Sequence, residues 1–488
     1  MADAPDDLLA VVEAGKAITH SHLNAQVNRL AGGLASLGVA AGDRVAWCGP
    51  NSTQVVVAMH ACRKLGVVAV PMSYRFTAEE YRHLLSDSGA VVVLVDAAYA
   101  PAVAAVLPEL PAVQMVTFEI AALGSVDEPP PPSNPAKTMM YTSGTTGRPK
   151  GAIRGPADPA LRAAMMAELD FGDAEVHLVT GPLYHAGPHA FALLAHLTGG
   201  ALVVTRSFDP AEWIRLVAEH HVTSAFLAPT HLKRIVSLPS QVLRAADLSS
   251  LRCLIVNAAP VPYALKREVV ATLGGGFLYE VYGSTELGIV TVLGPEDQLR
   301  KPGSCGRPYG DIELKVVGAD GAETAIGEPG ELFVQTTQAF EGYHGGAEPL
   351  EELPGDPTWR SVGDIGWLDD EGYLHICDRK TDMLITGGMN VYPAEVEAVL
   401  HAHPDVADAA VIGVPDDEWG ERVHAVVAPR AGRLLDADAL DAFVAVRLAG
   451  FKRPRSWDFR ADLPRTESGK LLKRVLRDEH RDGQPSQV

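Results

Sequence analysis

The sequence predicts an α/β protein with a large N-terminal domain of layered sheets, a small β-rich subdomain and a small α+β domain at the C-terminus. First, helical segments alternate with short, nearly all-apolar strands up to about residue 281, as in a parallel sheet covered on both faces. Second, strands interrupted by Gly and Pro follow Gly303, and a further unit begins near Asp378. Third, the length of 488 residues exceeds what a single core needs.

The predicted elements follow the apolar pattern in order. Residues 23–37 place leucine and valine at helical spacing, and a second helix is expected near 54–65. The Pro-rich stretch 127–135 is expected to be a semi-rigid surface connection. The expected strands share short runs of apolar and β-branched residues, and they are 44–47, 67–70, 91–95, 177–180, 202–205, 224–227, 253–256, 277–281, 312–317 and 331–335.

Charge and cysteine content exclude several classes of protein. The chain has 41 Lys and Arg against 61 Asp and Glu, a formal net charge of −20. This charge repels nucleic acid and anionic membranes, so we expect neither as a partner. The five cysteines are far apart without a C-x-x-C pair, which fits a reducing cytoplasm. The acidic N-terminus does not resemble an export signal, and no membrane-spanning segment is predicted.

The most informative segment is the Gly-rich run at 141–151, YTSGTTGRPKG. Its glycines, hydroxyl groups and two cations suit a loop whose backbone N–H groups and side chains surround phosphate oxygens. The spacing from Gly144 to Lys150 differs from that of a Walker loop, because a Gly follows the lysine where a Ser or Thr would be needed. On spacing alone, an ordinary surface loop remains the alternative.

This segment resembles the phosphate loop of the adenylate-forming superfamily, which includes acyl-CoA synthetases, peptide-synthetase adenylation domains and beetle luciferases. Further segments match that pattern in order, at 282–286, 362–366, 378–390 with 393–395, and 464–470. The resemblance extends over nearly the whole chain. It implies an N-terminal adenylation domain at 1–378, a hinge at 379–382 and a mobile C-terminal domain at 383–488, with the active site between the two domains.

The resemblance assigns roles that agree with the chemistry. A carboxylate that attacks the α-phosphorus of ATP needs nearby cations to offset repulsion. Thr285 is expected to donate a hydrogen bond to the α-phosphate, and Glu286 to hold Mg²⁺. Asp364 is expected to accept from the ribose hydroxyls. Tyr282 is expected to stack on the adenine, and a buried core tyrosine is the alternative. The residues expected to bind ATP or AMP are Thr142, Ser143, Gly144, Thr145, Thr146, Gly147, Lys150, Asn257, Ala258, Ala259, Pro260, Tyr282, Gly283, Ser284, Asp364 and Arg379.

Two predicted functions depend on the C-terminal domain. By resemblance, Lys470 bridges the acyl carboxylate and the α-phosphate, a task suited to a compact ammonium on a flexible stem. From the composition of its Pro-, Gly- and Ser-containing segment alone, the alternative prediction is that Lys470 is an exposed lysine in a loop. Rotation about the hinge at Thr381 would then bring Gly387 and Gly388 over the site to form a tunnel for CoA, because paired glycines permit close backbone approach. A plain hairpin turn is the alternative for the two glycines.

The acyl pocket is expected beside the nucleotide. Its predicted residues are His185, Phe226, Leu227, Ala228 and Val281, with His189 and Thr230 nearby. His185, also placed among the catalytic residues, is interpreted as lining the pocket and not as a base; a structural hydrogen bond is the alternative. No arginine is expected in this pocket, so acids with a second carboxylate are disfavoured.

The sequence therefore predicts an acyl-CoA synthetase that uses MgATP and CoA. Its substrate is expected to be a fatty, aryl or steroid-side-chain acid. One alternative is an enzyme that loads an acyl carrier protein, and another is a catalytically silent sensor of nucleotides or acyl ligands; luciferase chemistry is a residual alternative. The acid itself depends on pocket volume and is not determined by the motifs. The sequence is compatible with a homodimer but does not indicate one.

Overall fold

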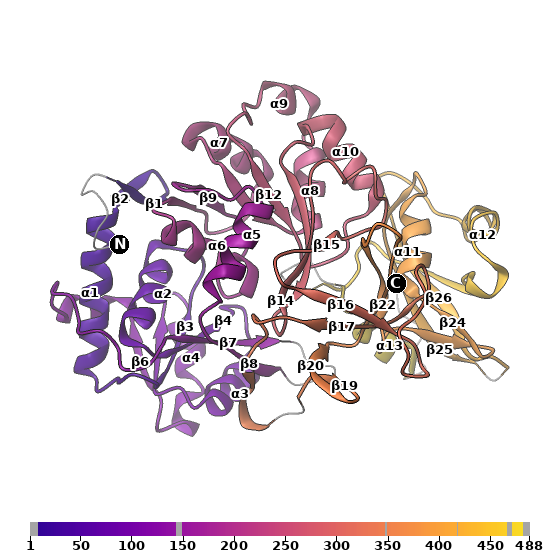
Figure 1. Ribbon diagram of the computed structural model, residues 1–488. Coiled ribbons are helices and arrows are strands. Elements are labelled where there is room, and N and C mark those ends of the chain that lie inside the picture. The colour runs from indigo at the N-terminus through magenta and orange to yellow at the C-terminus, as the bar shows by residue number, and fades with distance from the viewer. Residues whose placement is uncertain (1–7, 143–148, 347–348, 417, 466–470, 482–488) are drawn as a thin grey trace.

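The computed structural model describes residues 8–142, 149–346, 349–416, 418–465 and 471–481. Their strands form four sheets, and Figure 1 shows the N-terminal elements at one side of the molecule and the C-terminal elements at the other. The α/β class, the β-rich subdomain and the small C-terminal α+β unit are confirmed. Among the described residues, no helix has the length and apolar character needed to cross a membrane.

The first sheet has the order β18-β8-β7-β4-β3-β5-β6. Its centre is parallel because helices connect its strands, and the two faces are covered by α1 (His20–Ser36), α2 (Thr53–Leu65) and α3 (Ala78–Ser88). The strands are β3 (Arg44–Cys48), β4 (Val68–Met72), β5 (Val92–Val95), β6 (Gln114–Thr117), β7 (Lys137–Thr142), β8 (Lys150–Arg154) and β18 (Gly342–Tyr343). The antiparallel pair β7–β8 flanks the Gly-rich segment, of which residues 143–148 lie outside the described residues.

The second sheet has the order β15-β14-β13-β12-β11-β9-β10-β1-β2. Helix α6 (Ala186–Leu197) packs in the main core, which also contains residues of α1 and α2, so it joins the first two sheets (Figure 1). The strands are β1 (Leu9–Glu13), β2 (Lys16–Thr19), β9 (Val176–Val179), β10 (Ala201–Val204), β11 (Ser224–Leu227), β12 (Cys253–Val256), β13 (Leu278–Ser284), β14 (Gly288–Leu293) and β15 (Arg307–Pro308). The outer helices are α7 (Pro210–His220), α8 (Pro229–Val236), α9 (Ser240–Ala245) and α10 (Tyr263–Leu273).

The β-rich subdomain supplies a third, antiparallel sheet, β19-β20-β17-β21-β22, with β16 on β17. The strands are β16 (Glu313–Val317), β17 (Gly330–Gln335), β19 (Glu351–Leu353), β20 (Asp356–Ser361), β21 (Asp364–Leu368) and β22 (Leu374–Arg379). The antiparallel pairing of β21 with β22 places Asp364 opposite Arg379. Two residues that the sequence separates by a turn therefore lie side by side.

The C-terminal unit has its own core, formed between its sheet β24-β23-β26-β25 and its helices. The strands are β23 (Leu384–Thr386), β24 (Met389–Val391), β25 (Val406–Asp416), β26 (Gly420–Pro429) and β27 (Ser456–Phe459), and the helices are α11 (Pro393–His401), α12 (Ala437–Ala445) and α13 (Lys473–Arg481). Asp378 at the end of β22 accepts a hydrogen bond from the backbone N–H of Ala394 (2.9 Å). The division of the chain at 378 and 383 stays a prediction.

The N-terminal core contains histidines that burial keeps neutral. His60 and His196 share a 2.8 Å hydrogen bond. His177 lies 3.0 Å from the Ser224 hydroxyl and packs beside the rings of Phe171 and Phe191. Burial lowers the pKa of His177 to about 3 and that of His196 to about 4. Protonation of either ring would place a positive charge in an apolar surrounding, which costs free energy.

Acid is therefore expected to destabilise the fold. Histidine in the unfolded chain has a pKa near 6.5, so below that pH these histidines are protonated in the unfolded state but stay neutral in the folded state. The free energy of unfolding therefore falls as the pH drops toward 4. Each such histidine contributes roughly 1 kcal/mol per pH unit in this window. We expect the urea midpoint to be lower at pH 5 than at pH 7, with a smaller difference in His177→Gln. The exposed His22→Gln serves as control, and equal differences in all three proteins would contradict this.

Candidate active site

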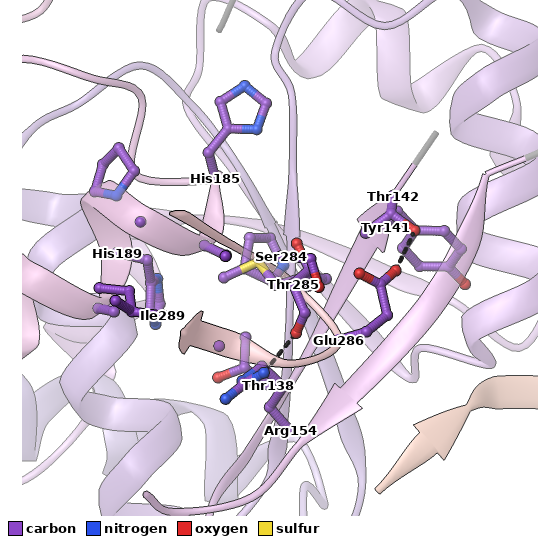
Figure 2. A pocket seen from close by; sticks show the side chains of 18 of the residues that line it. Thr138, Tyr141, Thr142, Arg154, His185, His189, Ser284, Thr285, Glu286 and Ile289 are labelled. Atoms are coloured by element: carbon purple, nitrogen blue, oxygen red, sulfur yellow. Dashed lines mark hydrogen bonds between the residues drawn. The ribbon is translucent and has the colours of Figure 1, made fainter. Parts of the chain in front are cut away.

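A cavity of about 1480 Å³ lies where the first two sheets meet the β-rich subdomain. Its walls include the ends of β7 and β8, the turn between β13 and β14, and the start of α6. Figure 2 shows Thr142 and Glu286 on one side of Thr285 and His185 and His189 on the other. The cavity thus joins a polar end to a largely apolar end.

Glu286 occupies the turn between β13 and β14 at the polar end. Its side chain is buried, and its Oε1 accepts a hydrogen bond from the Thr142 hydroxyl (3.3 Å), which is visible in Figure 2. The same oxygen accepts a second hydrogen bond from the Tyr343 phenol (2.8 Å). The Phe340 backbone N–H donates to the Glu286 carbonyl (2.7 Å), which fixes the turn. Burial and the Glu286 charge raise the pKa of Tyr343, so its phenol remains a donor.

The carboxylate of Glu286 fits the role of a magnesium ligand. Both of its side-chain hydrogen bonds within the described part of the chain use Oε1, which leaves Oε2 for a cation in the cavity. Carboxylate oxygens are hard ligands, and Mg²⁺ in nucleotide sites takes one or two of them together with phosphate oxygens. Lys150 lies 5.4 Å from the centre of the Tyr343 ring, so the Gly-rich segment brings a cation to the same corner.

Arg154 is a residue of this corner that the sequence reasoning missed. Its guanidinium donates to the backbone carbonyls of Thr285 (2.5 Å) and Gln338 (2.7 Å). Burial lowers the pKa of Arg154, and the nearby Glu286 charge opposes this shift. Arg154 therefore holds the 285–286 turn in place. The available signal was its position on β8, where Lys150 and Arg154 share a face at a spacing of four residues.

Asp364, Tyr282 and Arg379 form a second polar group beside the cavity. The Tyr282 phenol donates to Asp364 Oδ2 (2.6 Å), and Arg379 Nε lies 3.3 Å from Asp364 Oδ1. Burial and the Asp364 charge raise the pKa of Tyr282. Arg379 lines the cavity together with Val362 and Gly363, which precede Asp364. The predicted ribose and adenine roles of Asp364 and Tyr282 stay predictions.

The loop after β12 reaches the cavity through two of its four predicted residues. Asn257 and Ala258 line the cavity, while Ala259 and Pro260 are not among its lining residues. Asn257 Nδ2 donates to the Val281 carbonyl (2.8 Å), which ties the loop to β13. Ala258 has φ +79°, a conformation that is costly for a residue with a Cβ and that is often found at functional sites.

The apolar end begins at His185, which precedes the first turn of α6. Its Nε2 is buried without a hydrogen-bond partner among the described residues, and burial lowers the pKa of His185 to about 4. The ring is therefore neutral near pH 7. A Cβ at Gly187 would come within 2.5 Å of the Phe226 ring, so glycine lets α6 approach this wall closely. Phe226 and Ala228 also line the cavity, and their role in the acyl pocket stays a prediction.

Two predicted members of the acyl pocket do not line the cavity. Leu227 is next to Phe226 on β11, and successive strand residues face opposite sides, so Leu227 packs in the core behind the sheet. Val281 is buried in the main core and is likewise not a lining residue. Their assignment to the acyl pocket stays a prediction, because a run of apolar residues does not reveal which side faces a ligand.

Two arginines line the cavity, although the sequence predicted no arginine for the acyl pocket. Arg63 on α2 and Arg162 on α5 (Pro159–Glu168) both line the cavity. Burial lowers the pKa of Arg63, and the positive charge of Arg162 lowers it further. Two like charges at one cavity wall favour an anion between them. The two residues are about a hundred positions apart, so the sequence did not bring them together.

The predicted residues of the C-terminal part are placed only in part. Lys470 lies outside the described residues, but Arg465 and Leu471 pair across that gap, and Leu472 lines the cavity. Thr381 also lines the cavity. Gly387 and Gly388 are exposed and absent from its walls. The roles of Thr381, Gly387, Gly388 and Lys470 stay predictions.

Comparison with known families matches both parts of the chain. A family model described as AMP-binding enzyme matches residues 1–344, and one described as AMP-binding enzyme C-terminal domain matches residues 395–470. The chain is 38% identical over 475 residues to a feruloyl-CoA synthase of an Amycolatopsis species, covering 96% of this chain and 95% of that protein. It is 34% identical over 491 residues to the fatty acid–[acyl-carrier-protein] ligase ScoC of Streptomyces coeruleorubidus, covering 96% and 93%.

A solved structure shows the same fold. The O-succinylbenzoate coenzyme A synthetase of Bacillus subtilis, in complex with ATP and magnesium ion, superposes with a TM-score of 0.84 and is 29% identical. The superposition covers 97% of this chain and 96% of that one. The similarity therefore includes the arrangement of the two parts of the chain and not only the N-terminal sheets.

Proposed function

The chain belongs to the AMP-binding enzyme family of adenylate-forming acyl-CoA ligases, and we propose that it converts a fatty, aryl or steroid-side-chain acid to its CoA thioester. In the first step the acid and ATP give acyl-AMP and pyrophosphate; in the second, CoA displaces AMP. The observation that carries this proposal is one cavity that joins the polar corner of Thr142 and Glu286 to an apolar end at His185 and Phe226.

In the first step a carboxylate oxygen forms a bond to the α-phosphorus while the bond to pyrophosphate breaks. Lys150, Arg379 and Lys470 offset the repulsion between the two anions, and Thr285 donates a hydrogen bond to the α-phosphate. Mg²⁺ held by Glu286 would neutralise charge on the phosphate oxygens. The acid is already ionised near neutral pH, so no general base is needed, which agrees with the neutral His185 at the pocket wall.

In the second step the CoA sulfur forms a bond to the acyl carbonyl carbon and gives up its proton to solvent, while AMP leaves with the electrons of the broken C–O bond. Lys470 occupies the approach to this carbonyl during the first step. Rotation about Thr381 would remove Lys470 and bring Gly387 and Gly388 to the cavity. The exposure of both glycines is consistent with an arrangement that precedes this rotation.

The apolar end supports an acid with a large apolar body. Thioether and aliphatic side chains from α2, β7, α5 and α6 line it, and such side chains adapt to aromatic or aliphatic groups. They are Met59, Met140, Leu161, Met165, Leu193 and Leu194. The relatives that act on feruloyl and fatty acyl groups fit this lining.

The function is tested with a panel of fatty, aryl and steroid carboxylates. Purified full-length protein is mixed with MgATP and each acid, and pyrophosphate release is measured with CoA, with an acyl carrier protein, or with neither. Acid-dependent pyrophosphate release and an acyl-CoA detected by mass are expected. Product only with the carrier protein would replace the CoA proposal by carrier loading. Tight ATP binding without acid-dependent release would indicate a silent sensor.

A second substrate class is an acid with an additional carboxylate far from the reacting one. Arg63 and Arg162 at the cavity wall favour it, and the O-succinylbenzoate of the solved relative carries two carboxylates. A hydrogen bond to a charged group such as a guanidinium contributes about 1.5–3 kcal/mol, and the exposure of Arg63 to solvent favours the lower end of that range. The apolar monocarboxylates remain the first proposal, because the lining of that end is mainly aliphatic.

Substitution of Arg63 distinguishes the two classes. If a second carboxylate binds there, Arg63→Gln lowers kcat/KM for an aryl dicarboxylate by about 10- to 100-fold and leaves a matched monocarboxylate nearly unchanged. Arg82→Gln is the control, because Arg82 is partly exposed, pairs with Glu109 and lies outside the cavity walls. Equal effects of Arg63→Gln on both acids would contradict recognition of a second carboxylate.

A further inference from the structure

A separate polar cluster lies in the C-terminal unit, formed by His424 on β26, Asp458 on β27 and His480 on α13. One ligand atom from each of the three lies within 4.8 Å of the others. His480 Nε2 is 3.3 Å from Asp458 Oδ2, and His424 Nε2 is 3.8 Å from the same oxygen. None of the three lines the catalytic cavity.

The fold brings these residues together from three elements. Strands β26 and β27 are parallel, with His424 opposite Ser456 and Val426 opposite Asp458. His424 and Val426 share a face of β26, and Val426 packs in one cluster with Leu476 of α13. His480 follows Leu476 by one helical turn and therefore lies over the same face of the sheet.

Both imidazole rings are oriented with Nε2 toward the carboxylate. His480 Nδ1 donates to the Leu476 carbonyl (2.7 Å), so Nε2 of the neutral ring carries the lone pair. His424 Nδ1 lies 2.8 Å from the Ser456 hydroxyl, and its Nε2 is buried without a hydrogen-bond partner among the described residues. Histidines that bind metals are commonly fixed in this way through their other nitrogen.

We propose that His424, Asp458 and His480 form a binding site for a divalent transition metal ion of the zinc type. Two tetrahedral zinc ligands at the usual bond lengths lie about 3.3–3.4 Å apart, close to the 3.3 Å and 3.8 Å separations here. Three protein ligands leave the fourth position to water. Two imidazoles and one carboxylate select zinc, cobalt or nickel over Mg²⁺, which prefers oxygen ligands alone.

Two arginines face the cluster and oppose a cation. Arg460 Nη2 is 3.8 Å from Asp458 Oδ2 and competes for it, but the same nitrogen donates to Glu479 at 2.6 Å. Arg422 Nε lies 3.3 Å from the Ser456 hydroxyl, and its Nη1 is 3.6 Å from Asp416. Both charges are thus partly compensated by carboxylates outside the cluster.

The position of the site suggests a structural role. A metal ion would fasten α13 to the sheet, and α13 begins at Lys473, three residues after the predicted catalytic Lys470. The ion would stabilise the segment that follows the catalytic loop without touching the substrates.

The site is tested on tag-free, full-length protein stripped of metal with a chelator. Titration with Co²⁺ is expected to give a visible tetrahedral absorption band at one equivalent, and Zn²⁺ is expected to displace it and raise the Tm. His480→Ala and Asp458→Asn should each weaken Zn²⁺ binding at least tenfold. The exposed His22→Ala is the control. Asp458 is partly exposed, and Asp458→Asn keeps the size of the side chain, so this variant is expected to fold. It therefore still tests the site if His480→Ala unfolds α13.

The proposal is supported if Co²⁺ binding to the wild type saturates at one equivalent, both with and without ATP, and if this binding is lost in both ligand variants. Absence of the cobalt band, or equal Zn²⁺ affinity in the wild type and both ligand variants, overturns it and leaves the cluster as an ion pair.

Discussion

Replacement of Lys470 by alanine is expected to lower acyl-AMP formation by about 10²- to 10³-fold and to leave thioester formation from supplied acyl-AMP nearly unchanged. The ammonium is proposed to bridge the carboxylate and the α-phosphate, where negative charge increases in the transition state, and removal of such a group typically costs two to three orders of magnitude. In the second step the carboxylate is already joined to AMP as a mixed anhydride and no longer carries its charge, so the Lys470 ammonium has no carboxylate to bridge.

The two half-reactions are measured separately. Acid-dependent pyrophosphate release reports the first, and conversion of synthetic acyl-AMP and CoA to thioester reports the second. Arg474→Ala is the matched control, because this exposed cation lies four residues beyond Lys470 on the first turn of α13. Equal losses in both half-reactions would show that Lys470 acts through the fold and not on the first step.

Glu286→Gln is expected to lower the rate of acyl-AMP formation by about 10²–10³ and to raise the Mg²⁺ concentration needed for half-maximal activity. Glutamine keeps the size of the side chain and an oxygen that can accept from Thr142 and Tyr343, so the turn is retained. The negative charge is lost, and with it the ligand proposed for the cation.

Tyr343→Phe separates the charge of Glu286 from its hydrogen bonds. This variant removes one hydrogen-bond donor to the Glu286 carboxylate and keeps its charge. Loss of that hydrogen bond costs about 0.5–1.5 kcal/mol, which corresponds to a roughly 2- to 10-fold lower rate. Pyrophosphate release at increasing Mg²⁺ is measured for both variants. A similar small effect, with the same Mg²⁺ dependence in Glu286→Gln and Tyr343→Phe, would exclude the role of Glu286 as a metal ligand.

The sequence by itself determined the fold class and the location of the polar end. Alternation of apolar strands and amphipathic helices depends on local periodicity, so strands such as β3 and β5 could be predicted nearly to the residue. The segments at 141–151 and 282–286 carry hydroxyl, cationic and acidic groups at fixed spacing within short loops. Thr142, Lys150 and Glu286 were therefore named as one site, and in the structure they meet at one corner of the cavity.

Only the tertiary structure decided which residues complete the cavity. Arg154 supports the 285–286 turn from β8. Arg63 and Arg162, on two different helices, both line the cavity, and Leu227 faces away from the cavity that Phe226 lines. The histidine cluster of the C-terminal unit likewise requires the register of β26 with β27 and the docking of α13. A motif records neighbours along the chain, whereas contacts between distant segments depend on how sheets and helices pack, and residue spacing carries no information about that packing.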